Sequence, residues 1–387
     1  MRIHHLHNAF CFSQQEEFYF INSMQTILPD TKFLNLLNTL TGKIVLPQEK
    51  KEHSIFGIPD DNRSVIFPQI STTINERNYF LSVKGIGAKT PLYGSHPLEF
   101  IFKSDFGLKK EINNKQIVKR FFSSELWFGE APYGAQGKEA LADIKITNNS
   151  NDCSINGFYI CPIVEVNVIP EQLLEKSKNI YWYRKYKGIF YQEQRLVPSN
   201  IRLYHQSELN LGQKSAGVCS LFNITTIEEF DKFIDNYIKS GLAALTLYSR
   251  TLRKIDDRIV GLDYVDVWLD KDSVLAPDGT LHFVDLEGLD WIVGFDEEDI
   301  IKRCRRQFDR NYYEFMFGLD LLLKERHVRF SQYTPGMDDL RKELTVRVEM
   351  ALMIDPYLDY EKNSNELNII LKPVNFQEIS ITMINLK

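Results

Sequence analysis

The sequence changes character after Pro170, and this change constrains the fold more than any other feature. Before Pro170, short runs of β-branched and aromatic residues alternate with turn residues, which predicts a mainly antiparallel sheet. The predicted strands are 64–67, 79–83, 98–102, 157–160 and 163–166. After Pro170, long stretches have helical periodicity. We therefore expect an α+β protein with two lobes, a sheet lobe followed by a mainly helical lobe.

The later part of the chain carries the strongest helix signals. Thr226 and Glu229 have the capping-box spacing, and the apolar residues that follow them recur on one helical face. The expected helices cover residues 138–143, 226–254, 296–325 and 337–354, and two closing strands are expected within 367–386.

These patterns divide the chain into three parts. Residues 1–63 form an N-terminal extension, 64–169 a β-rich lobe and 170–387 a helical lobe with the closing strands. With 387 residues, of which 43% are hydrophobic, the chain is long enough to bury its core without metal or disulfide support. Its net charge of −6 is not that of a dedicated nucleic-acid binder, so we do not expect nucleic acid as a main partner, although local basic patches fit such a total.

The cysteine pattern points to a reducing compartment. The five cysteines are scattered and none belongs to a C-x-x-C pair, so neither a disulfide framework nor a zinc site is predicted. No segment approaches the 18 or so apolar residues of a membrane span. We expect a cytoplasmic protein without membrane contact. His4, His5 and His7 lack a matching carboxylate or cysteine and are interpreted as surface residues.

The segment from Gly261 to Gly288 holds the densest set of carboxylates with a defined spacing. Pro277-Asp278-Gly279 is a strong turn signal, and the residues on either side suit two short strands, which predicts a β-hairpin over residues 273–284.

Two aspartates flank this hairpin. Asp272 comes directly before it and Asp285 directly after it, so both carboxylates are expected at its open end. Hard oxygen ligands of this kind suit a shared Mg²⁺ ion, which takes further oxygens from water or phosphate. Glu287 points to the same side as Asp285 if the strand continues, and it is a third candidate ligand.

The order of an acidic loop, a short hairpin, an apolar pair and Asp285-Leu-Glu-Gly288 resembles the catalytic and metal-binding segments of the protein-kinase-like superfamily. That superfamily includes the aminoglycoside and choline phosphotransferases and the selenoprotein-O-like adenylyltransferases. In it, an acidic or Asn residue before the hairpin and an Asp after it hold the metal that bridges the nucleotide phosphates. The resemblance implies that Asp272 and Asp285 bind Mg²⁺ and that Asp266 lies nearest to the position of a catalytic base.

A second stretch is similar to the same superfamily. The residues from Phe80 to Pro91 contain Lys84-Gly85-Ile-Gly87, like the Lys-Gly-x-Gly-x-Thr-Pro stretch of the selenoprotein-O-like enzymes. This similarity implies that Lys84 contacts the phosphates of ATP, and that Gly85 and Gly87 allow close backbone approach to them.

An acidic partner is expected to orient Lys84. Glu139, in the short predicted helix, is the first choice, and Glu125 and Glu130 compete with it. The sequence also departs from the superfamily, because no G-x-G-x-x-G loop precedes Lys84 and no His-Arg-Asp triplet precedes the hairpin. The resemblance covers about residues 64–330 as an order of elements.

The expected function is therefore an ATP- and Mg²⁺-dependent transferase of kinase-like fold, which moves a phosphoryl or nucleotidyl group to an unknown acceptor, a protein or a small molecule. Two alternatives stay open. One is a catalytically inactive nucleotide-binding pseudokinase or scaffold. The other is a two-metal nuclease, in which Asp285 and Glu287 would form the Asp-x-Glu motif.

Structural explanations compete with each of these interpretations. A Lys-Gly-x-Gly turn serves turn geometry alone in many proteins. The carboxylates between Asp263 and Asp272 fit a solvated loop, and the aromatic and basic run 181–187 fits packing at a lobe boundary. The basic residues between Lys302 and Arg310 are interpreted as a solvated helix face that pairs with the acidic residues 296–299.

Overall fold

The chain divides into two compact units. In this computed structural model, unit 1 comprises residues 1–148 and 161–200, and unit 2 comprises residues 149–160 and 201–387. The expected lobe boundary at residue 169 falls inside unit 1. The residues that the structure describes are 2–5, 8–14, 43–48, 56–60, 64–84, 135–136, 153–168, 190–202, 217–264, 269, 272–284, 286, 289–331, 336–363, 366–373 and 376–385.

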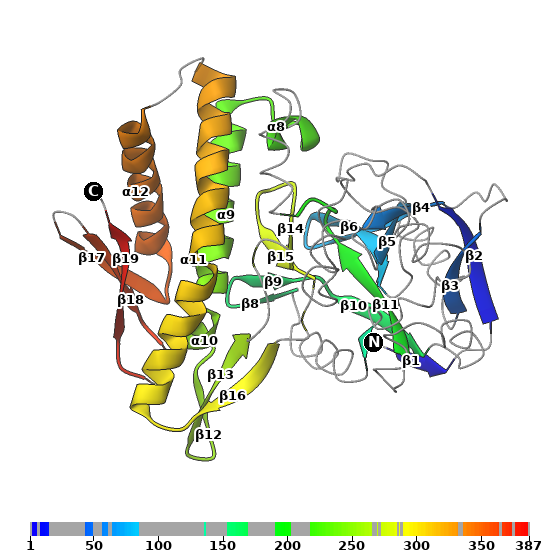
Figure 1. The fold of residues 1–387 in the computed structure, drawn as a ribbon, viewed down its shortest axis with the longest axis horizontal. Helices are drawn as coiled ribbons and strands as arrows, with labels where there is room; N and C mark the ends of the chain where they lie inside the picture. Colours follow the sequence, from blue (N-terminus) through cyan, green and yellow to red (C-terminus); the bar gives the residue numbers. More distant parts are fainter. Residues whose placement is uncertain are drawn as a thin grey trace, which may run out of the picture. The chain divides into compact units, whose positions relative to one another are not determined.

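Unit 1 is built around a β-sheet with the strand order β1-β10-β11-β6-β5-β4-β2-β3, and β7 pairs with β11 (Figure 1). The ladders from β10 to β4 are antiparallel, as expected, whereas β1 with β10 and β2 with β3 and β4 are parallel. The strands are β1 Arg2–His5, β2 Asn8–Gln14, β3 Lys43–Gln48, β4 Phe56–Asp60, β5 Ser64–Ile74, β6 Arg77–Lys84, β7 Ala135–Gln136, β10 Ile163–Val168 and β11 Phe190–Val197.

Three of the expected strands of unit 1 are confirmed. Residues 64–67, 79–83 and 163–166 lie in β5, β6 and β10. The hairpin between β5 and β6 turns at Asn75 and Glu76, which both have positive φ angles, of 48° and 64°. Such angles suit the right-handed twist of the flanking strands. The expected strand 98–102 and the expected helix 138–143 lie outside the described residues.

β11 was not expected from the sequence, because its centre is polar. Glu193, Gln194 and Arg195 are nevertheless buried in the sheet. Glu193 and Arg195 lie on the same face of the strand, and the Glu193 Oε2 atom accepts a hydrogen bond from Arg195 Nη2 at 2.5 Å. The ion pair offsets part of the cost of removing both charges from water.

Unit 2 contains the helices and three small sheets, ordered β12-β13-β16, β14-β15-β9-β8 and β17-β18-β19 (Figure 1). Helices and sheets together confirm the expected α+β class. The elements are β8 Ser154–Ile155, β9 Phe158–Ile160, α8 Val218–Leu221, α9 Ile227–Leu245, α10 Leu247–Arg250, β12 Arg253–Ile255, β13 Arg258–Tyr264, β14 Ser273–Leu275, β15 Leu281–Phe283, β16 Leu289–Gly294, α11 Glu297–Arg326, the π-helical turn η4 His327–Ser331, α12 Met337–Ile354, β17 Leu358–Asn363, β18 Glu366–Leu371 and β19 Ile379–Asn385.

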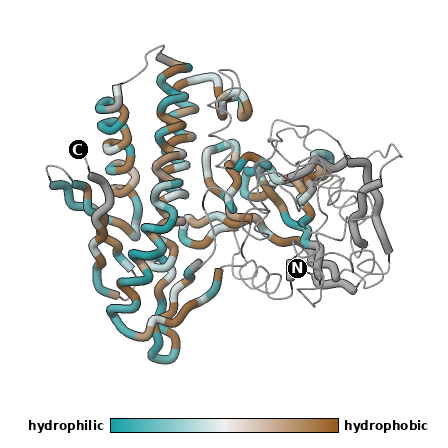
Figure 2. Tube along the Cα trace, viewed as in Figure 1, coloured by the Kyte–Doolittle hydropathy of each residue, from teal (hydrophilic) through white to brown (hydrophobic). Residues whose placement is uncertain are grey.

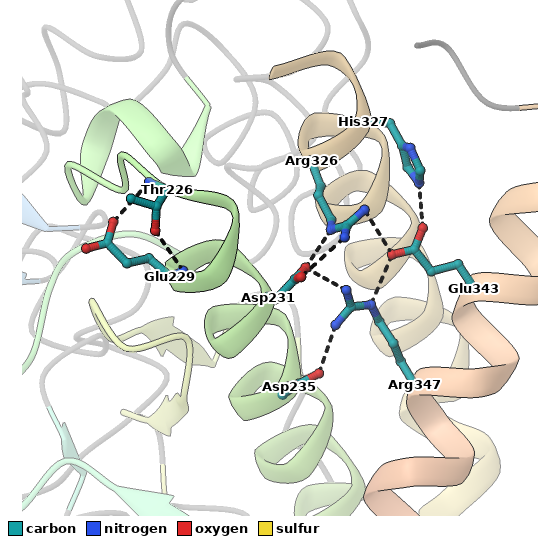
Figure 3. Close-up of polar contacts among 8 residues, drawn as sticks. All are labelled: Thr226, Glu229, Asp231, Asp235, Arg326, His327, Glu343 and Arg347. Carbon is teal, nitrogen blue, oxygen red and sulfur yellow. Dashed lines mark hydrogen bonds and ion pairs between the residues drawn. The ribbon is translucent and has the colours of Figure 1, made fainter. Parts of the chain in front are cut away.

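Helix α9 is the central helix of unit 2. Its capping box forms as expected, with Thr226 and Glu229 each accepting a hydrogen bond from the other's main chain (Figure 3). The expected helix over 226–254 is too long, because α9 ends at Leu245 and a strand begins at Arg253. Thr246 interrupts the helix with a φ of −119°, and its hydroxyl donates to the Leu242 carbonyl.

The other expected helices agree closely with the structure. Helices α11 and α12 match the expected 296–325 and 337–354 to within one residue. Brown and teal segments alternate along α9, α11 and α12 in Figure 2, as in helices with one apolar face. In the described part of the chain, no helix combines the length and apolar character of a membrane span.

The closing strands expected within 367–386 are present as β18 and β19. A third strand, β17, completes their sheet and was not expected. Its sequence, Leu-Asp-Tyr-Glu-Lys-Asn, is mostly polar, and Leu358 is its only buried residue. A strand with so little buried surface has no clear hydrophobic alternation.

A charge network joins α9, α11 with η4, and α12 (Figure 3). Asp231 lies at its centre, where its carboxylate contacts Arg326 Nε at 2.5 Å and Arg347 Nη2 at 2.6 Å. Arg347 also contacts Asp235 at 3.0 Å. Burial alone would raise the pKa of Asp231, but the hydrogen bond from Arg326 and the charges of Arg347 and Arg326 outweigh it and lower this pKa. The network comprises Asp231, Asp235, Arg326, His327, Glu343 and Arg347.

We expect Asp231→Asn to destabilise the protein in a pH-dependent way. Because the pKa of Asp231 is lower in the folded than in the unfolded chain, its charge stabilises the fold above the unfolded value of about 3.9. This stabilisation is lost as the pH falls through the folded value. Urea unfolding at a series of pH values measures the difference in unfolding free energy between wild type and variant, and this difference should shrink toward acid pH. Asp235→Asn, which removes a single ion pair, should have a smaller effect. If the difference in unfolding free energy between wild type and Asp231→Asn stayed constant down to acid pH, the charge of Asp231 would not be the source of the stabilisation.

Candidate metal and nucleotide site

The hairpin predicted at residues 273–284 is present. Strands β14 and β15 pair in antiparallel register, with Ser273 opposite Phe283 and Leu275 opposite Leu281. The turn closes through hydrogen bonds from the Ala276 N–H to the Thr280 carbonyl and from the Gly279 N–H to the Ala276 carbonyl. All residues of both strands are buried, so the hairpin is part of the core of unit 2.

Helix α9 holds the tip of the hairpin. The Asn236 side-chain amide donates to the Asp278 carbonyl at 2.8 Å, and the Ser240 hydroxyl accepts from the Leu281 N–H at 3.0 Å. Gly279 has a φ of +92°, and a β-carbon there would lie 2.1 Å from the carbonyl oxygen of Phe233. Only glycine fits this position without displacing α9.

The second strand of the hairpin pairs in parallel with β9, which comes from far earlier in the sequence. Phe158 stacks on Phe283 with ring centroids 4.4 Å apart, and Tyr159 stacks on His282 at 5.0 Å. His282 is fully buried, and its Nε2 atom lies 2.9 Å from the Thr280 hydroxyl oxygen. His282 was not predicted from the sequence, because its contacts depend on the pairing of β15 with β9.

Asp272 stands at the open end of the hairpin, as predicted. Its carbonyl accepts a hydrogen bond from the Val284 N–H at 2.9 Å, so the ladder continues one residue beyond the two strands. Asp285 is the next residue after Val284. The side chain of Asp272 is almost wholly buried. The other predicted residues of this segment, Asp266, Asp285 and Glu287, lie outside the described residues.

Two buried amides of α11 support the chain that leads to the hairpin. The Asn311 side-chain oxygen accepts from the Leu269 N–H at 3.0 Å, and the Gln307 side-chain nitrogen donates to Asp263 Oδ1 at 3.1 Å. The Ser273 hydroxyl donates to the Leu269 carbonyl. Gln307 and Asn311 were not predicted, although two amides four residues apart on a buried helix face are a signal for such anchoring.

The interpretation of the carboxylates from Asp263 to Asp272 as a solvated loop is wrong for Asp263. This residue does not lie in a solvated loop, because it belongs to β13 and is only 8% exposed. Its second carboxylate oxygen lies 3.7 Å from Arg303 Nη1. The acidic segment therefore begins inside the fold.

Lys84 lies at the end of β6 in unit 1, as the sequence predicts. Its main chain pairs with Ser64 of β5 and with Glu193 of β11, and its side chain is 3% exposed. Gly85, Gly87 and the expected acidic partner Glu139 lie outside the described residues. Among the residues that are described, no group of three or more His, Cys, Asp and Glu side chains is arranged to hold a metal ion.

Comparisons with known proteins add little. No protein-family model matches the chain, and the curated proteins give no significant match. Among solved structures, the complex of Rv3197 with erythromycin from Mycobacterium tuberculosis matches at 14% identity, with 86% of this chain and 68% of that chain covered and a TM-score of 0.27. Because this TM-score is low, nothing about fold or function is concluded from the match.

Proposed function

We propose that this protein is an ATP- and Mg²⁺-dependent transferase of two-lobed, protein-kinase-like fold, which moves a phosphoryl or nucleotidyl group to a protein or small-molecule acceptor. The hairpin is the observation that carries the proposal. A buried, tightly anchored β-hairpin has an aspartate directly before its first strand, and a second aspartate follows the last residue of its ladder. This is the arrangement by which kinase-like enzymes hold the metal ion of the nucleotide.

In the proposed reaction, Asp272 and Asp285 would hold Mg²⁺, with Glu287 as a further ligand, and Lys84 would neutralise phosphate charge. Asp266 would accept the proton of the attacking acceptor hydroxyl. The acceptor oxygen then forms the new bond to phosphorus, and the bond from that phosphorus to the leaving group breaks, which releases ADP in phosphoryl transfer or pyrophosphate in nucleotidyl transfer. Positioning and charge neutralisation supply most of the rate in such reactions.

The register of the hairpin sets a geometric condition on this proposal. Asp272 pairs with Val284 and shares its face of the ladder. A strand that continued in extended form would turn the Asp285 side chain to the opposite face. A shared ion therefore requires Asp285 to leave the extended conformation.

One observation favours the alternative of an inactive nucleotide-binding relative. Lys84 and Asp272 are 3% and 5% exposed, so little of either side chain is open to a ligand in this structure. A buried lysine and a buried aspartate also serve as structural groups when each has a partner.

A binding experiment and a transfer experiment separate these functions. We expect ATP with Mg²⁺ to raise the melting temperature of the full chain, and ATP with EDTA to raise it less. Lys84→Met should reduce the shift, while Lys254→Met, at an exposed lysine of β12, should leave it unchanged. A Mg²⁺-dependent shift without transfer of label from ATP to any protein or small molecule would support the inactive relative. Absence of any nucleotide-dependent shift would refute both.

A further inference from the structure

Helix α11 carries an exposed stripe that is basic in its first half and aromatic in its second. At about 100° per residue, the positions of the stripe fall within a sector of about 80° on the helix. Its exposed members are Lys302, Arg306, Tyr313 and Phe317, and Arg310, in the same sector, is half-buried. The distance from the first to the last is about 22 Å along the helix axis. Arg305 lies about 60° outside this sector, and Asp309 lies between Arg305 and the stripe.

The basic half of the stripe borders a hollow of about 780 Å³. The described residues around it are Glu298, Ile301, Lys302, Arg305, Arg306, Asp309 and Arg310. These comprise four cations and two carboxylates, which leaves a net charge of +2. A hollow of this charge favours an anionic ligand.

Three of the four cations around the hollow are available to a ligand. The expected pairing of the basic residues with residues 296–299 is found for Arg303, whose Nε atom lies 2.9 Å from Asp299 Oδ2. Within the described part of the chain, Lys302, Arg305 and Arg306 form no ion pair. All three are exposed.

The aromatic half of the stripe is exposed to a degree unusual for large rings. Tyr313 is 78% exposed and Phe317 is 54% exposed. They lie four residues apart, so their rings emerge from the same face of the helix. Exposed rings in line with a row of cations are the combination that binds unstacked bases together with their phosphates.

We propose that this face of α11 binds single-stranded nucleic acid. Lys302, Arg305 and Arg306 would contact phosphates, and Tyr313 and Phe317 would stack on bases. A duplex fits less well, because its bases are already stacked and offer no free face to the rings. An acidic peptide would satisfy the cations and is the competing ligand. The net charge of −6 of the whole chain does not oppose a local site, since exposed charges beyond about 10 Å are screened at ordinary salt.

Fluorescence anisotropy with a labelled oligouridylate and the full-length protein tests the proposal. If three phosphates are neutralised, the logarithm of the binding constant should fall with the logarithm of salt concentration with a slope of about −2. Arg306→Gln should make this slope shallower by about 0.7. Tyr313→Ala should weaken binding about tenfold and leave the slope unchanged. Lys254→Gln, at an exposed lysine on β12, is the control and should change neither quantity.

Each other outcome overturns the proposal. Absence of binding at low salt refutes it directly. If Arg306→Gln and Lys254→Gln reduce the slope equally, the interaction is diffuse attraction and not a site on α11. If labelled polyglutamate binds as tightly as the oligouridylate, and Tyr313→Ala weakens both alike, the face belongs to an acidic protein partner. These results do not depend on ATP or Mg²⁺, so they are independent of the proposed transferase activity.

Discussion

Asp285→Asn should lower the rate of label transfer from ATP on the order of a thousandfold, if the protein is the transferase proposed above. The exchange keeps the size of the side chain but removes the negative charge that would hold Mg²⁺ against the phosphates. Mg²⁺ binds through few protein carboxylates, so the loss of one is not made up by its neighbours. The measurement is the initial rate of transfer under saturating ATP and Mg²⁺.

The matched control for this variant is Asp290→Asn. Asp290 is an exposed aspartate on β16, five positions further along the same acidic segment. It should retain nearly the full rate. A rate for Asp285→Asn equal to that of Asp290→Asn, with both proteins folded by circular dichroism, would remove Asp285 from the proposed metal site.

Gly279→Ala should lower the free energy of unfolding by about 3 kcal/mol or more, a large loss for the addition of one methyl group. The φ of +92° at Gly279 is unfavourable for any side chain, and the new β-carbon would lie 2.1 Å from the Phe233 carbonyl oxygen. The clash involves main chain on the α9 side, so no side-chain rotation relieves it. The melting temperature should fall by about 6 to 12 °C.

Gly157→Ala separates the two causes of this loss. Gly157 has a similar φ of +86°, but the nearest atom to an added β-carbon is Ala243 Cβ at 3.4 Å, an ordinary contact. It should therefore show the backbone cost alone, about 1 to 2 kcal/mol. Equal losses in the two variants, measured by urea unfolding, would mean that the hairpin tip is not tightly fixed against α9.

The features that the sequence predicts well are those with local signals. The hairpin at 273–284 follows from Pro277-Asp278-Gly279 and the short strands beside it, and the start of α9 follows from Thr226 and Glu229. Each of these signals acts within a few residues, so no knowledge of the rest of the fold is needed.

The features that were missed depend on partners distant in the sequence. β11 is polar, and it becomes a buried strand because it pairs with β6, more than a hundred residues earlier. The same holds for the candidate site. The position of Asp272 follows from the hairpin, whereas the anchoring amides Gln307 and Asn311 become recognisable only once Asp263 and Leu269 are known to contact them.

The path of the chain between the units decides where the protein can be cut into fragments. Strands β8 and β9 belong to unit 2, although residues 161–200 of unit 1 separate them from the rest of it. A fragment that starts at Ile201 would leave the edge of β15 open, and an open edge invites pairing with other chains. Such a fragment should aggregate on expression, and a peptide of residues 149–160 supplied in trans should restore a well-behaved monomer.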